Sequence, residues 1–180
     1  MTDSGHVLPT DDDGALSPEE ERHAADVLRF WEVARSRAGL TRLSAVVGTG
    51  VLASVPPPVG RLAEDPAAAD ARLALVLDGT VTAVSAPLAG FAGDDPVLPQ
   101  VDDLWIVADG AGRPRALLRT TAVEVVRLGD VDASRVRAET GDDDVAAWRR
   151  EVEAAVRDAA GVEADDDTEL VVEHVVVVHS

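Results

Sequence analysis

The chain has 180 residues, 46% of them hydrophobic, and a formal net charge of −18. This length and apolar content suffice for a substantial core, which excludes a chain that is disordered throughout. Cysteine is absent and all 16 basic residues are arginine, so disulfides, cysteine metal sites and lysine nucleophiles are excluded. The acidity also disfavours non-specific binding to nucleic acid, which depends on the neutralisation of phosphates.

The ends of the chain suggest where the folded part begins. Residues 1–16 are acidic and rich in turn formers, and we predict a disordered tail followed by a single domain over 17–180. The start has neither the basic residues nor the apolar run of a signal peptide. No apolar stretch reaches the roughly 18 residues that a membrane span needs. We therefore expect a cytoplasmic protein, and arginine without lysine suggests a bacterium with a GC-rich genome.

Helix signals recur along the chain. Ser17-Pro18-Glu19-Glu20 has the pattern of a capping box and predicts a helix as far as about Ala38. Apolar residues at helical spacing give this helix an expected buried face, which consists of Ala24, Val27, Leu28, Trp31 and Ala34. Asp65-Pro66 begins a second predicted helix that ends at Gly79. Further helical segments are predicted over 132–138 and from 142–144 to about Ala160.

Strand signals lie between these helices. Patterns rich in β-branched residues predict strands over 80–85, 104–108, 115–128 and 170–178, the last one central in its sheet. Asp109-Gly110-Ala111-Gly112 is typical of a hairpin turn between the second and third strands. Residues 40–58 are compatible with a strand, a loop or a short helix. The order of elements predicts an α+β fold, with a small β-barrel and helices packed on its outside.

Several classes of site are absent from the sequence. There is no Walker loop, dinucleotide fingerprint, nucleophile elbow or zinc-protease motif. The aspartate runs at 11–13, 142–144 and 165–167 lack the spacing of a calcium loop and are interpreted as helix caps and solvated turns. The histidines are dispersed along the chain, at His6, His23, His174 and His179. We therefore predict neither a metal site nor a cofactor.

One set of segments resembles a known family. Residues 75–85, with the sequence LVLDGTVTAVS, and 101–115, with the sequence VDDLWIVADGAGRPR, resemble two signature blocks of ASCH domains, relatives of the PUA domain. Three further segments fit the same family in the same order: Phe30-Trp31-Glu32, residues 119–123, and residues 138–142 followed by 148–150. The resemblance covers roughly residues 27 to 178.

The resemblance implies a small PUA-like barrel with a cleft where the signature strand meets the helices. ASCH domains are proposed to bind RNA, and some members are amidohydrolases of acetylated cytidine or a ribonuclease. The amidohydrolases use a lysine, a threonine three residues later and a glutamate. Here the corresponding residues are Val81, Val84 and Glu139. Because valine can neither attack a carbonyl nor activate a nucleophile, we predict that the family's hydrolytic mechanism is absent.

The first hypothesis is therefore a binding module for RNA, a nucleotide or a modified nucleoside. Its predicted ligand-binding residues are Gly79, Thr80, Thr82, Ser85, Trp105, Arg119 and Glu139. Glu139 could hydrogen-bond a ligand or could anchor the turn before Gly141, and both interpretations stay open. Trp148 is expected in the core. The arginines near the hairpin and on the long strand could form a local basic surface, namely Arg113, Arg115, Arg119 and Arg127.

Two other hypotheses compete with it. One is a rewired amidohydrolase or nuclease acting on a cytidine derivative or RNA, in which a neighbouring hydroxyl replaces the missing threonine. The other is a protein-interaction or regulatory domain with a vestigial cleft. A polar pocket would favour the first hypothesis over this last one.

Overall fold

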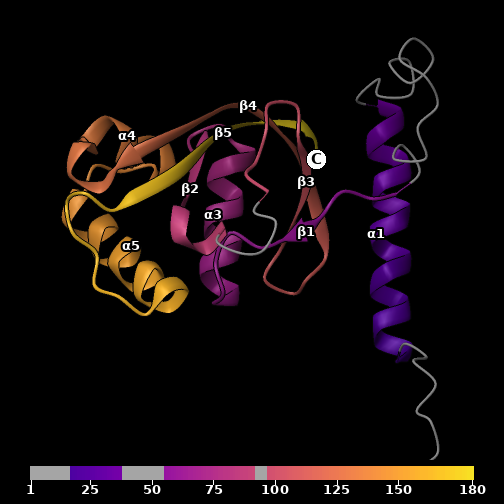
Figure 1. Cartoon of the computed structure of the whole chain (residues 1–180). Coiled ribbons are helices and arrows are strands. Elements are labelled where there is room, and N and C mark those ends of the chain that lie inside the picture. The colour runs from indigo at the N-terminus through magenta and orange to yellow at the C-terminus, as the bar shows by residue number, and fades with distance from the viewer. Residues whose placement is uncertain (1–16, 38–54, 92–96) are drawn as a thin grey trace, which may run out of the picture.

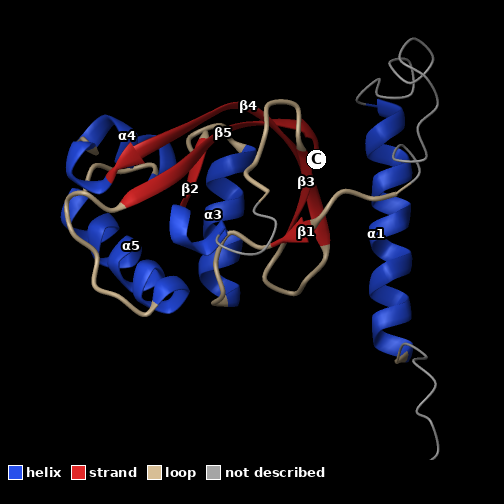
Figure 2. Cartoon of the chain, in the orientation of Figure 1, coloured by secondary structure: helices blue, strands red, loops and turns tan. Residues whose placement is uncertain are grey.

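The computed structural model describes residues 17–37, 55–91 and 97–180, so the predicted tail over 1–16 and most of segment 40–58 lie outside it. Within these residues the helices are α1 (Pro18–Arg37), α3 (Pro66–Leu77), α4 (Ala133–Thr140) and α5 (Val145–Ala160). The strands are β1 (Val59–Gly60), β2 (Ala83–Pro87), β3 (Leu104–Ala108), β4 (Pro114–Arg127) and β5 (Glu169–His179). Short 3-10 helices cover Leu88–Phe91 and Leu128–Asp130. The predicted α+β class is confirmed (Figures 1 and 2).

The helix ends follow from local chemistry. The N–H of Glu20 bonds to the Ser17 hydroxyl, and the N–H of Ser17 bonds to the Glu20 carboxylate, as the capping box predicts. Asp65 caps α3 by accepting a 2.8 Å hydrogen bond from the N–H of Ala68. Asp132 and Asp144 cap α4 and α5 in the same way. The last two helices end at Gly141 and Gly161, whose φ angles of 84° and 67° favour glycine.

The five strands form one mixed sheet in the order β1-β3-β4-β5-β2. The closed barrel that we predicted is therefore wrong, because β1 pairs only with β3 and β2 pairs only with β5. The predicted central position of the last strand is confirmed, since β5 lies between β4 and β2. Strand β1 has only two residues, and β3 is its one partner among the described strands.

Helix α3 packs on one face of this open sheet. Leu73 and Val76 of α3 share a core cluster with Val107, Leu118 and Val175 of the strands. Helix α1 packs on the opposite face, where Val27 and Trp31 meet Ile106 and Leu117. The neighbours Leu117 and Leu118 on β4 thus point to opposite faces, as alternation along a strand requires.

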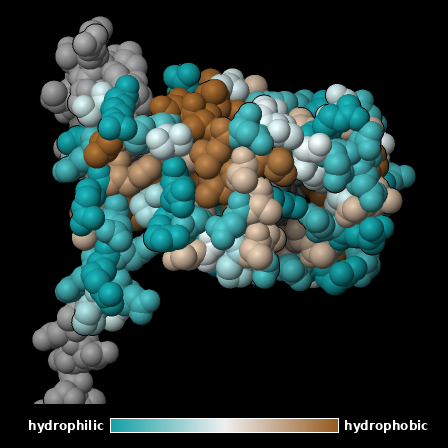
Figure 3. Space-filling model, turned by 180° about the vertical axis from the view of Figure 1, so that it is seen from behind, coloured by the Kyte–Doolittle hydropathy of each residue, from teal (hydrophilic) through white to brown (hydrophobic). Residues whose placement is uncertain are grey.

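The buried face of α1 is narrower than predicted. Val27, Trp31 and Ala34 are buried, whereas Ala24 is exposed and Leu28 is 48% exposed. The helix meets the sheet mainly along β4 and β5, through the face that carries its three buried residues. Seen from behind, the outward side of α1 is largely hydrophilic, and apolar residues gather beside it towards the body of the molecule (Figure 3).

Helices α4 and α5 complete the fold beside β2. Val136 of α4 and Trp148, Val152 and Val156 of α5 form a core cluster with Leu128 and Leu170. No helix in the described part of the chain is long and apolar enough to cross a membrane.

Strand β2 begins three residues later than predicted. The N–H of Thr80 bonds to the Asp78 carboxylate at 2.9 Å, and the N–H of Thr82 bonds to the carbonyl of Ala138 at 2.8 Å. The N–H of Val81 likewise bonds to the carbonyl of Leu75. These three N–H groups thus donate to the Asp78 side chain and to carbonyls of α3 and α4. The ladder with β5 therefore starts only at Ala83.

A charged cluster joins β4, β5 and α4, and its strength depends on pH. Glu124 accepts hydrogen bonds from Arg135 at 2.5 and 3.1 Å, and its Oε1 lies 3.0 Å from Nε2 of His174. The hydrogen bonds from Arg135, and then from His174, lower the pKa of Glu124 to about 2. Because the pKa of Glu124 is lower in the folded protein than in the unfolded chain, its ionised carboxylate stabilises the fold at pH values above the unfolded-state pKa. This stabilisation is lost as the pH falls towards 2.

Replacing Glu124 by glutamine is therefore expected to reduce the free energy of unfolding at pH 6 and to have little effect at pH 2. The side chain is 37% exposed, so solvent screening limits the reduction to about 1 kcal/mol. Urea unfolding of both variants at the two pH values measures it. An equal loss at both values would mean that the ionised form of Glu124 contributes nothing.

Candidate functional site

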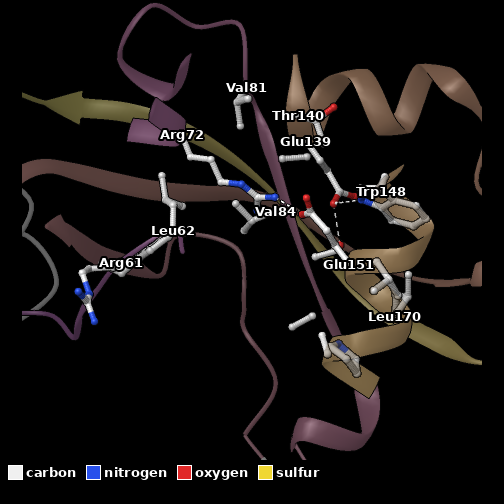
Figure 4. Close-up of a pocket in the computed structure, with 17 residues that line it drawn as sticks. Arg61, Leu62, Arg72, Val81, Val84, Glu139, Thr140, Trp148, Glu151 and Leu170 are labelled. Carbon is white, nitrogen blue, oxygen red and sulfur yellow. Dashed lines mark hydrogen bonds and ion pairs between the residues drawn. The ribbon is translucent and has the colours of Figure 1, made fainter. Parts of the chain in front are cut away.

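A cavity of about 310 Å³ lies along the edge strand β2, between α3 on one side and α4 and α5 on the other (Figure 4). We call it the Glu139 cavity. Its lining comprises Arg61, Leu62, Arg72, Val81, Ala83, Val84, Ser85, Ala86, Pro87, Trp105, Glu139, Thr140, Trp148, Glu151, Val152, Ala155 and Leu170. Its volume is at the lower end of the range for small-molecule sites.

Glu139 is the best-anchored polar group of the cavity. The Ser85 hydroxyl donates a 2.7 Å hydrogen bond to its Oε2, and the indole Nε1 of Trp148 donates a 2.9 Å hydrogen bond to the same oxygen. Among the described residues, none donates a hydrogen bond to Oε1. The carboxylate is thus fixed by two neighbours and keeps one oxygen available as an acceptor.

Local structure explains the position of Glu139. It lies in the last turn of α4, which stops at Gly141. A Cβ atom at Gly141 would approach Cγ2 of Thr80 to 3.0 Å, so this glycine also lets the helix end lie close to the chain that leads into β2. The close approach places Glu139 within reach of Ser85 on β2.

A second charged pair reaches across the cavity. Arg72 of α3 forms an ion pair with Glu151 of α5, and Figure 4 shows the two side chains extending towards each other. Their side chains are 38% and 62% exposed. Because such exposed pairs contribute little to stability, the contact can exchange partners at low cost.

The remaining walls are largely apolar. Val81 is 4% exposed and belongs to the core cluster under α3, and Val84 packs against the same cluster. Trp105 lines the cavity too, and its buried Nε1 has no hydrogen-bond acceptor among the described residues. An apolar wall with a few fixed polar groups is typical of sites for small organic ligands.

The structure brings together three of the predicted ligand-binding residues. Ser85, Trp105 and Glu139 all line the cavity. Gly79, Thr80 and Thr82 do not, because they form the turn and the exposed connection between α3 and β2. Arg119 is also outside, since it pairs in register with Leu104 on β3, which packs towards α1.

The predicted basic surface is neutralised in part. Arg113 and Arg115 both form ion pairs with Asp109, at 3.0 and 3.3 Å. Arg127 lies 3.5 Å from Asp167. These three arginines therefore have carboxylate partners close by.

Sequence reasoning missed Arg72 and Glu151, which no motif signals because they are far apart in the chain. It placed Trp148 in the core, and this is confirmed by its 5% exposure, but it missed the hydrogen bond to Glu139.

Another hollow, beside Trp105 and Val84, contains Glu173. Burial raises the pKa of Glu173, although the Thr120 hydroxyl donates a 2.9 Å hydrogen bond to it. Across the described ranges, no three histidine or acidic side chains are placed to hold a metal ion.

Comparison with known proteins gives the family. The family model described as "ASCH domain" matches residues 61–179, which is most of the chain. A crystal structure of a protein from Enterococcus faecalis with the family designation DUF984 has 21% sequence identity and a TM-score of 0.69, covering 86% of this chain and 88% of that one. The structure of an ASCH domain from Lactobacillus crispatus has 22% identity and a TM-score of 0.63, covering 81% and 96%. No curated protein matches the sequence significantly. The chain belongs to the ASCH domain family.

Proposed function

We propose that this ASCH domain binds a nucleobase in the Glu139 cavity, presented by RNA, a nucleotide or a modified nucleoside, and that it lacks the amidohydrolase chemistry described for some relatives. The observation that carries the proposal is the fixed carboxylate of Glu139, with Oε2 held by Ser85 and Trp148 and Oε1 left as an acceptor. An exocyclic amino group of a base is a suitable donor to Oε1.

The surroundings of Glu139 support this assignment. The rings of Trp105 and Trp148 and the side chain of Leu62 supply apolar surface in the same cavity. A planar base buries apolar area against such walls, while its polar edge needs few but well-placed partners. An open cavity with fixed polar groups also disfavours the hypothesis of a vestigial cleft used only for protein contacts.

Thermal unfolding with a panel of ligands tests the proposal. The panel contains nucleosides, nucleotides, acetylated cytidine and short single-stranded RNA. A ligand at about 100 times its dissociation constant adds roughly 2.7 kcal/mol of stability, which raises the midpoint measurably. A rise with one class identifies the ligand, and no rise with any of them contradicts the proposal.

Hydrolysis is the second candidate function, because Ser85 donates a 2.7 Å hydrogen bond to a carboxylate and could in principle act as a nucleophile. Two features weigh against it. Trp148 already donates to the same oxygen of Glu139 that Ser85 uses, and Val81 offers no charge to activate a hydroxyl.

We expect the natural protein to release no acetate from acetylated cytidine. The double substitution Val81→Lys and Val84→Thr is expected to produce measurable release, since both positions line the Glu139 cavity. Liquid chromatography of the products measures it, and the variant with Glu139→Gln added is the matched control. Release by the natural protein that Ser85→Ala abolishes would favour the hydrolase instead.

A further inference from the structure

The charged residues of the Glu139 cavity carry an inference that rests on the proposed function and refines it. The cavity has four charged lining residues, Arg61, Arg72, Glu139 and Glu151, so its formal charges balance in a chain whose net charge is −18. An anionic ligand group therefore meets less repulsion here than over the rest of this acidic surface.

Arg72 is the cation that reaches across this cavity. It extends from α3 over the space beside β2, and its contact with Glu151 uses Nη2 as the only donor that bonds within the described residues. A guanidinium carries five N–H donors in a planar fork, so most of the donors of Arg72 remain available. Such a fork matches the oxygens of a phosphate group.

The ion pair between Glu151 and Arg72 is exposed to solvent. The side chain of Glu151 is 62% exposed and that of Arg72 is 38% exposed, which makes the pair weak and sensitive to salt. A phosphate that enters the cavity can replace the Glu151 carboxylate at the guanidinium, because its oxygens match the same planar fork of donors. The released Glu151 side chain then returns to solvent at little cost.

The opposite charges of Glu139 and Arg72 define the ligand. Glu139 offers an acceptor to a donor on the base, and Arg72 offers donors to an anion. We infer that Arg72 recognises the phosphate attached to the nucleoside, replacing Glu151 with it, and that the cavity selects phosphorylated over unphosphorylated nucleosides. The phosphate belongs either to a free nucleotide or to an RNA strand.

Calorimetric titration of the full chain with the four ribonucleosides and their 5′- and 3′-monophosphates tests this selection. The natural protein is expected to bind at least one monophosphate about tenfold more tightly than the same nucleoside, as hydrogen bonds to charged groups imply. Arg72→Gln should abolish this advantage, so that the monophosphate binds no more tightly than its own nucleoside. Glu151→Gln should raise the affinity for the monophosphate roughly two- to fivefold, because the competing carboxylate is gone.

Arg150→Gln is the matched control, because Arg150 is an exposed arginine of α5 that does not line the cavity. This variant should retain the full advantage of the monophosphate. Dinucleoside monophosphates, which carry only an internal phosphodiester, distinguish an RNA strand from a free nucleotide. A gain with either source that Arg72→Gln removes supports the role of Arg72.

Two results would overturn the inference. If nucleosides and monophosphates bind equally well, or if the advantage survives Arg72→Gln, Arg72 does not recognise phosphate, although the proposed base site stands. If no nucleoside or nucleotide binds at all, the proposed function fails together with the inference.

Discussion

Replacement of Glu139 by glutamine is expected to weaken the binding of a nucleoside that carries an exocyclic amino group by about 10- to 100-fold. Ser85 and Trp148 both donate to Oε2, so they hold the amide oxygen of glutamine in the same place and turn its NH2 group into the position of Oε1. An acceptor in the cavity thereby becomes a donor. Binding of cytidine should fall, and binding of uridine, whose O4 is an acceptor, should rise relative to it.

Isothermal titration of both proteins with cytidine and uridine measures this change in preference. Glu153→Gln is the control, because Glu153 is a glutamate of α5 that pairs with Arg149 and does not line the cavity. An unchanged ratio of the two affinities in Glu139→Gln would show that Glu139 does not contact the base.

Replacement of Gly110 by alanine is expected to lower the free energy of unfolding by about 2 to 3 kcal/mol. Gly110 lies in the turn between β3 and β4, and a Cβ atom there would approach the carbonyl oxygen of Pro66 to 2.2 Å. Since that oxygen belongs to the backbone at the start of α3, the clash cannot be relieved by a side-chain rotation. The 2.7 Å hydrogen bond from the N–H of Gly110 to Asp70 holds the turn against the helix.

Gly112→Ala in the same turn is the comparison. Gly112 has a φ of 79° but open space around it, so alanine meets only backbone strain of about 1 kcal/mol. Urea denaturation of the two variants measures the difference. An equal loss of stability would mean that the turn does not press against α3. Because α3 carries Arg72, Gly110→Ala should also disturb the cavity.

Local features of the fold could be predicted well from the sequence. The capping aspartates and the turn at Asp109 depend on interactions between residues close in the chain, and the structure confirms them. The apolar run of β5 is likewise visible in its own residues. The closed barrel could not be judged in this way. Closure depends on pairing between β1 and β2, and no local pattern in the sequence records that these two edge strands do not pair with each other.

The candidate site was predictable only in part. The resemblance to ASCH domains indicated Glu139 and the strand beside it, and both lie at the cavity. Thr80 and Thr82 were expected there on the assumption that the strand began at residue 80. Arg72 and Glu151 meet only through the packing of α3 and α5 around β2, a contact between residues far apart in sequence that carries no motif.

The indole N–H signals of the three tryptophans in a two-dimensional NMR spectrum test the central claim most directly. Trp148 donates to Glu139 and Trp105 lines the cavity, whereas Trp31 lies in α1 against the other face of the sheet and serves as an internal reference. Addition of a nucleotide that binds in the Glu139 cavity should shift the Trp148 and Trp105 signals in a saturable way and leave that of Trp31 unchanged. If the Trp148 and Trp105 signals stay in place throughout titrations with nucleosides, nucleotides and short RNA, the cavity is not a nucleobase site.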